Sequence, residues 1–202
     1  LTNEGIDSVL DGLEELSYSE LTDDYKETTG NEGKFKSMVK NGTYYKVTEQ
    51  DIFKYIVGTV RIKNFLVHDS EYKKNMGSNG KSYEQIWLID RELLYKTLEL
   101  KNELGEQNYD PDGFYVRCGH RHPEYNKEIG GASRSQHIAG KACDITVLDV
   151  NKDGKTTQDD KQIILDILND KVIKNKGGIG RYPGTMSVHF DVRGKRARWD
   201  SY

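Results

Sequence analysis

The chain has 202 residues, which is enough for one sizeable hydrophobic core and too many for a small scaffold held by disulfides. Its 30 Lys and Arg against 33 Asp and Glu leave a formal net charge of −3, which argues against a nucleic-acid partner. Hydrophobic residues make up 35% of the sequence and the mean hydropathy is −0.81. No apolar run approaches the ~20 residues that a transmembrane helix needs, so we expect no membrane span.

The N-terminal part predicts helices. A weak helical pattern of apolar residues runs through residues 1–33. Thr48 is placed as a helix N-cap with Asp51 three residues later, and this spacing predicts a packed helix that carries Ile52 to Val57.

The rest of the chain predicts a mixture of helices and strands. Residues 77–82 form a turn cluster, and apolar residues three and four apart predict an amphipathic helix from Tyr83 to Leu104. Short runs of aromatic and β-branched residues then predict strands. The further expected elements are strands at 114–118, 142–147 and 186–192 and a helix at 157–168.

Three residues in the C-terminal half have the types and positions of metal ligands. His137 precedes Asp144 by seven residues, with Gly140 between them where the backbone can turn tightly, and His189 lies on a later predicted strand. Two imidazoles and one carboxylate with an open fourth position are typical of a catalytic zinc site. The spacing of the first pair alone is common, and a surface histidine near a helix cap would also explain it.

The sequence around these residues resembles the zinc D-Ala-D-Ala carboxypeptidase family of cell-wall metallopeptidases. That family's pattern is roughly S-G-Y-R-S-P-x-Y-N, then S-x-H-x-x-G-x-A-x-D, then a late H-V-D-x-R-G. The resemblance covers about residues 85–199 and includes three motifs in order. The matching segments are 119–126, 129–137, 140–145, 178–184 and 188–194.

The resemblance implies a catalytic zinc ion held by His137, Asp144 and His189. It also implies that Arg121 is a catalytic and substrate-binding residue that reaches the substrate carboxylate or the developing oxyanion. The planar fork of an arginine suits this role because it donates two parallel hydrogen bonds.

Two positions next to the first ligand, Ser135 and Gln136, are predicted to bind substrate or to orient the imidazole. The usual general base of the family is missing. Relatives carry Glu three residues before the last histidine or His two residues before it, and these positions are Met186 and Ser187 here.

Asp191, two residues after His189 on the same strand face, is the nearest carboxylate and is predicted as a catalytic residue. The alternative is that it anchors the ring of His189 or the side chain of Arg193. His120 and His122 are further candidates for the base. The departure from the family pattern also leaves room for a weak or altered activity, and the related hedgehog signalling domain keeps a similar zinc site as a binding module.

A second ion site is predicted at residues 149–160, which match a twelve-residue calcium loop. The loop resembles the calcium loop of dockerin modules, and a structural Ca²⁺ is expected there; the alternative is a solvated acidic turn. No second loop is found, so docking to a cohesin is not expected. The predicted ligands are Asp149, Asn151, Asp153, the carbonyl of Lys155 and Asp160, with Gly154 at the sharp turn.

These observations lead to an α+β fold, a small, mostly antiparallel sheet packed on helices, as in the hedgehog and D,D-peptidase folds. Residues 1–84 are expected to be an N-terminal helical elaboration and residues 85–202 the catalytic domain. The expected function is hydrolysis of peptidoglycan stem peptides as a D-Ala-D-Ala carboxypeptidase. The alternatives are an L-Ala-D-Glu or cross-bridge endopeptidase, or a catalytically weak zinc-containing wall-binding module.

The expected partners are peptidoglycan peptides, with neither nucleic acid nor membrane span, and the chain is expected to be a monomer. The expected location is extracellular or bound to a bacterial cell wall, although no export signal is present in the chain. Cys118 and Cys143 fit two buried thiols or one disulfide, and the sequence leaves both open.

Overall fold

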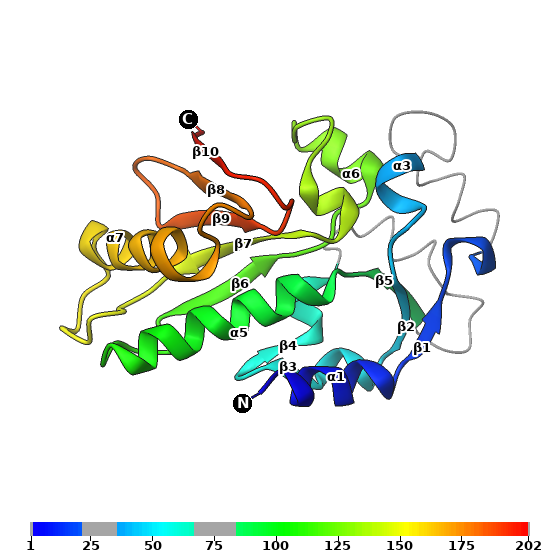
Figure 1. Ribbon diagram of the computed structural model, residues 1–202, viewed down its shortest axis with the longest axis horizontal. Helices are drawn as coiled ribbons and strands as arrows, with labels where there is room; N and C mark the ends of the chain where they lie inside the picture. The colour runs from blue at the N-terminus through cyan, green and yellow to red at the C-terminus, as the bar shows by residue number, and fades with distance from the viewer. Residues whose placement is uncertain (1, 22–35, 67–83, 202) are drawn as a thin grey trace.

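The protein is an α+β structure, as predicted, in which helices pack against small sheets (Figure 1). The computed structural model describes residues 2–21, 36–66 and 84–201, and the turn predicted at 77–82 lies outside these ranges. In the described part of the chain, no helix is both long and apolar enough to cross a membrane.

The described part of residues 1–84, where a helical elaboration is predicted, contains strands as well as helices. The helix expected after Thr48 is a single 3-10 turn followed by a strand. Thr48 N does donate to Asp51 Oδ2 at 3.0 Å, but the β-branched run after it pairs as a strand. The elements are α1 (Asn3–Asp11), β1 (Glu14–Leu16), η1 (Tyr18–Glu20), α3 (Lys36–Val39), β2 (Tyr44–Thr48), η2 (Asp51–Phe53), β3 (Tyr55–Val57), β4 (Val60–Arg61) and η3 (Ile62–Phe65).

The C-terminal elements follow the predictions except at their start. The helix expected from Tyr83 begins as a strand, and the helix itself starts after Asp90, whose side chain accepts from Glu92 N at 3.0 Å. The predicted strands and the helix after Thr157 are confirmed. The elements are β5 (Glu84–Leu88), α5 (Arg91–Glu106), β6 (Phe114–Cys118), α6 (Pro123–Glu128), η4 (Gln136–Ala139), β7 (Ala142–Val147), α7 (Gln158–Ile167), η5 (Leu168–Val172), β8 (Gly178–Arg181), β9 (Ser187–Asp191) and β10 (Ala197–Asp200).

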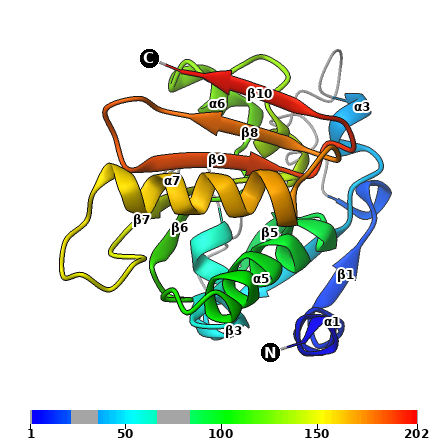
Figure 2. The same cartoon turned by 60° about the vertical axis from the view of Figure 1, so that its left-hand side comes forward.

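The five-stranded sheet has the order β10-β8-β9-β7-β6, and its neighbours are antiparallel except for the β10–β8 pair. Helices α5 and α7 lie side by side against it (Figure 2). Side chains alternate between the two faces of a strand. Because Cys143 and Ile145 of β7 and Phe190 of β9 belong to the hydrophobic core, Asp144 and His189 point to the opposite face.

The hydrophobic core crosses the boundary predicted at residue 84. Strand β5 pairs with β2, which belongs to the N-terminal part, over five residue pairs. One cluster of buried side chains includes residues from α1, β2, β5, α5 and β9. The N-terminal elements therefore contribute to the same packed interior as the sheet that carries the predicted zinc ligands.

Gly140 joins η4 to β7 and offers a test of this packing. Its φ is +65°, and a Cβ there would lie 2.4 Å from the backbone oxygen of Leu88. Gly130 is a matched control because its φ is +69° and a Cβ there would meet nothing within 4 Å. We expect Gly140→Ala to lower the free energy of unfolding by about 3 kcal/mol and Gly130→Ala by about 1 kcal/mol, measured by urea denaturation. Equal losses would show that backbone conformation alone matters at Gly140.

Candidate metal centre

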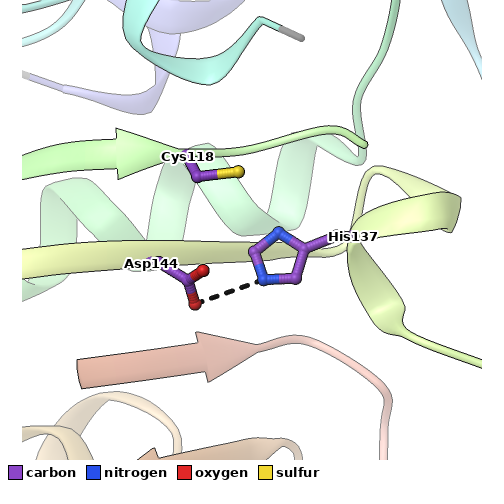
Figure 3. Close-up of side chains that lie close together, drawn as sticks. All are labelled: Cys118, His137 and Asp144. Atoms are coloured by element: carbon purple, nitrogen blue, oxygen red, sulfur yellow. Dashed lines mark hydrogen bonds and ion pairs between the residues drawn. The ribbon is translucent and has the colours of Figure 1, made fainter. Parts of the chain in front are cut away.

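The three predicted zinc ligands meet on the face of the sheet opposite α5 and α7. Asp144 of β7 is directly opposite His189 of β9 in the strand register. His137 lies in η4, and the left-handed residue Gly140 turns the chain back so that β7 can begin at residue 142. Figure 3 shows His137 and Asp144 pointing toward each other.

The donor atoms of these three side chains lie close together in a buried position. His137 Nε2 is 3.2 Å from Asp144 Oδ1 and 3.1 Å from His189 Nδ1, and His189 Nδ1 is 3.0 Å from the same Asp144 oxygen. The side chains are buried, with at most 5% of each residue exposed. Ligands at about 2.0–2.1 Å from a tetrahedral zinc ion are separated by roughly 3.3 Å, so the three atoms match three corners of such a site.

The other nitrogen of each ring has its own partner. His137 Nδ1 lies 2.6 Å from the carbonyl oxygen of Gly119, and His189 Nε2 lies 3.0 Å from Asp191 Oδ2. When these nitrogens donate, His137 Nε2 and His189 Nδ1 present lone pairs toward the carboxylate of Asp144. Three such atoms in a buried space need a proton or a metal ion between them, and their separations fit a zinc ion.

The surroundings of the site shift the pKa of each of its three groups. Burial would raise the pKa of Asp144, but the imidazole of His137 and the hydrogen bonds from both histidines hold that pKa well below its ordinary value. Burial lowers the pKa of His137, which favours the neutral ring. For His189 burial also lowers the pKa, but hydrogen bonds to Asp144 and Asp191 outweigh it and raise the pKa. The pKa shifts of Asp144 and His137 favour the forms that bind a metal, whereas the shift of His189 favours its protonated ring until a metal displaces the proton.

Asp191 is completely buried and its carboxylate is already engaged. It accepts from Gly178 N at 3.0 Å and from Arg193 Nε at 2.8 Å, in addition to its contact with His189. Burial would raise its pKa, but the hydrogen bonds from His189 and Arg193 keep the pKa well below its usual range. These contacts favour the alternative in which Asp191 anchors the His189 ring over the role of general base.

Arg121 lies beside the centre and is half-buried. Its Nη2 contacts Asp144 Oδ2, and its Nε donates to Cys118 Sγ at 3.1 Å. A β-bulge between Val116 and Cys118 places Cys118 opposite Asp144 and so turns its thiol toward the metal face. Donor atoms of Cys118, His137 and Asp144 lie within 4.8 Å of one another (Figure 3).

The two cysteines are free, and the question left open by the sequence is answered by their orientation. Cys143 precedes Asp144 on β7, so it points into the hydrophobic core while Cys118 points toward the metal face. Burial raises the pKa of both thiols.

The remaining predicted site residues have different surroundings. Ser135 is the N-cap of η4, and its Oγ accepts from His137 N at 3.4 Å, whereas Gln136 lines a cleft. His120 and His122 are only 2% and 1% exposed. Burial, with the neighbouring His122 and His137, lowers the pKa of His120 to about 3. A ring that binds a proton this weakly is a poor general base near neutral pH.

Residues that the sequence reasoning gave no role complete the site. Gly180 pairs with His189 in the sheet, and a Cβ on Gly180 would lie 2.7 Å from the Trp199 ring. A Cβ on Gly178 would lie 2.2 Å from Asp191 Oδ2. The Trp199 ring packs against His189, with 5.1 Å between ring centroids. The Gly-Ile-Gly run was the available signal, because glycines inside a strand mark the close approach of another group.

The predicted calcium loop folds around hydrogen bonds to its own backbone. Asp149 Oδ1 and Asn151 Oδ1 both accept from Asp153 N, at 3.1 and 3.0 Å. Asp160 is buried at the start of α7, where its Oδ2 accepts from Thr157 N at 2.8 Å in a capping box. Its Oδ1 accepts from Asn151 N at 3.0 Å, which ties the two ends of the loop together.

The geometry defines a class of protein: two buried imidazoles and one carboxylate that converge on one point are the protein ligands of a catalytic type of zinc centre. Residues 90–191, just over half of the chain, match the family model described as Peptidase M15. The chain therefore belongs to the M15 peptidase family, whose members are zinc metallopeptidases, and His137, Asp144 and His189 all lie in the matched segment. No curated protein and no solved structure matches the chain.

The two roles considered for Asp191 can be separated by Asp191→Asn. If Asp191 anchors His189, the variant should bind zinc about 10–100-fold more weakly, measured by competition with a chromophoric chelator. Asp200→Asn, on the exposed end of β10, is the control and should bind zinc like the wild type. Unchanged zinc affinity together with lost hydrolysis would instead support the general-base role.

Proposed function

We propose that the protein is a zinc-dependent peptidase that hydrolyses peptidoglycan stem peptides. The reaction that we propose is removal of the terminal D-Ala from D-Ala-D-Ala. The observation that carries this proposal is the three-donor centre with the Arg121 guanidinium beside it. Such a substrate would place the protein outside the cell or at a bacterial cell wall. Its partners would be wall peptides, with the chain acting as a monomer.

The residues of the chain have distinct parts in this reaction. His137, Asp144 and His189 would hold the zinc ion, which when bound polarises the scissile carbonyl and lowers the pKa of a water molecule toward ~7. The Gly119 carbonyl and Asp191 fix the orientation of the two imidazoles.

Arg121 would bind the terminal carboxylate of the substrate or the developing oxyanion. In the structure its charge is balanced by Asp144, and its Nε is held by Cys118, so the guanidinium is kept at the edge of the centre. A fork of two N–H groups suits a carboxylate better than a lysine would. An L-Ala-D-Glu or cross-bridge endopeptidase would use the same centre on an internal bond.

A second candidate is a catalytically weak zinc module that binds the cell wall. It is favoured by the surroundings of the residues that the sequence offered as general bases. Asp191 is engaged by His189 and Arg193, and both His120 and His122 are buried. A wall-binding module would keep the metal and Arg121 without fast turnover.

The proposed peptidase is tested by mass spectrometry of muropeptides after incubation with the zinc-loaded protein. Loss of one terminal alanine is expected, whereas a cut within the stem would indicate an endopeptidase, and no change a binding module. His137→Ala should lose stoichiometric zinc and all hydrolysis, because a site with one imidazole and one carboxylate binds zinc far more weakly. Retention of both zinc and hydrolysis by this variant would rule out the assigned centre.

For residues 149–160 we propose a structural Ca²⁺. Two features support it: Asp149, Asn151 and Asp153 lie in one short loop in which the side-chain oxygens of the first two meet at Asp153 N, and Gly154 has the positive φ of +84° needed at the sharp turn. The carboxylate of Asp160 would have to exchange its backbone hydrogen bonds for the ion. The ion would tie the end of β7 to the start of α7.

Asp153→Ala tests this site. In the presence of calcium the variant should have a lower Tm than the wild type, because one ligand of a stabilising ion is lost. In a chelator the two proteins should melt at about the same temperature. The melting temperatures are measured by calorimetry. An equal difference in Tm with calcium and with chelator would show that Asp153 acts through loop hydrogen bonds alone.

A further inference from the structure

A polar cleft of about 530 Å³ lies next to the metal centre. One wall comes from α3 and the turn before β2 together with the end of β5 and the start of α5, and the other comes from η4 and its neighbours. Gln136 lines the cleft and directly precedes the ligand His137, so the cleft begins one residue away from the centre. Consecutive Cα atoms are only 3.8 Å apart.

The lining of the cleft carries an excess of positive charge: Arg91, Arg134 and Lys141 against Asp90. Acidic side chains of the N-terminal part hold Arg91, and Lys141 Nζ lies 3.5 Å from Asp90. Arg134 is exposed, and within residues 2–21, 36–66 and 84–201 it makes no ion pair. The cleft therefore presents one uncommitted guanidinium and a second cation that is only loosely paired.

The walls of the cleft are joined by backbone hydrogen bonds. Asp90 N donates to the Gly140 oxygen at 2.9 Å, and Ile89 N donates to the Thr43 oxygen at 3.3 Å. These bonds fix the N-terminal wall to the segment that carries the first metal ligand. Much of that wall, including residues 37–43 and Leu88, lies before residue 90, where the match to the family begins. Much of the wall thus lies outside the matched segment.

We propose that this cleft binds a carboxylate-bearing stretch of the peptide substrate outside the scissile bond. The identity of that peptide rests on the proposed function. An extended peptide rises ~3.3 Å per residue, so a tripeptide spans ~10 Å, which a cleft of this volume accommodates. Arg134 would bind the carboxylate through two N–H groups, and Lys141 would add a second charge. A wall of this kind suits recognition of the stem rather than of D-Ala-D-Ala alone.

The test uses the stem tripeptide L-Ala-γ-D-Glu-L-Lys, which lacks D-Ala-D-Ala and is made with its C-terminus as an amide, and a second form in which the glutamate α-carboxylate is amidated as well. Binding to the zinc-loaded protein is followed by nuclear magnetic resonance of backbone amides. The free acid should shift the amides of Thr43, Gln136 and Lys141, and the amidated peptide should bind about tenfold more weakly. Arg134→Glu should weaken binding of the free acid about tenfold and leave the amidated peptide nearly unchanged.

Lys171→Glu is the matched control, because the substitution makes the same change of charge as Arg134→Glu. Lys171 is exposed on η5 and does not line the cleft. It should bind both peptides like the wild type. Equal affinity for the two peptides would overturn the proposal. An equal loss of affinity in Arg134→Glu and Lys171→Glu would also overturn it. Cleft binding without any hydrolysis of muropeptides would leave the proposal standing and reject the peptidase. Hydrolysis of muropeptides without a shift of the cleft amides would support the peptidase and reject binding in the cleft.

Discussion

Three hydrogen-bond acceptors face one another across about 3 Å in the buried centre of this protein, and much of the surrounding structure serves to keep them there. Without a metal ion or a proton between them these atoms repel one another, because two imidazole lone pairs and a carboxylate meet out of reach of water. The strand register sets Asp144 against His189, and the Gly119 carbonyl and Asp191 prevent the rings from turning away. The energy of metal binding is therefore partly the energy of relieving this repulsion.

The parts of the site that the sequence predicts best are those with a fixed local spacing. His137 and Asp144 are separated by a short turn around Gly140, and strand alternation then decides which residues share their face. The strand predicted at 142–147 has the bounds that the structure shows for β7, and the helix predicted from residue 157 begins one residue later, with Thr157 as its N-cap. Local hydrogen bonds and side-chain periodicity carry enough information for these elements.

Other features depend on contacts between distant segments and could not be read from spacing. The residues after Thr48 carry helix signals, but pairing of β3 with β4 overrides them. The bulge in β6 turns Cys118 to the face opposite Cys143, which no count of cysteines reveals. Trp199 reaches His189 only because Gly180 has no side chain, and this requires knowing that β8 lies next to both β9 and β10.

The position of Phe65 has a consequence for where this chain can be cut without loss of support for the metal centre. A Cβ on Gly119 would lie 2.5 Å from the Phe65 oxygen, which also accepts from His120 N at 3.0 Å. The peptide that orients the first ligand imidazole therefore leans on a residue 25 positions before the segment that relatives share. The segment matched to the family thus depends for its packing on residues outside it. Transplanting the shared segment alone would carry the ligands without the backbone support of one of them.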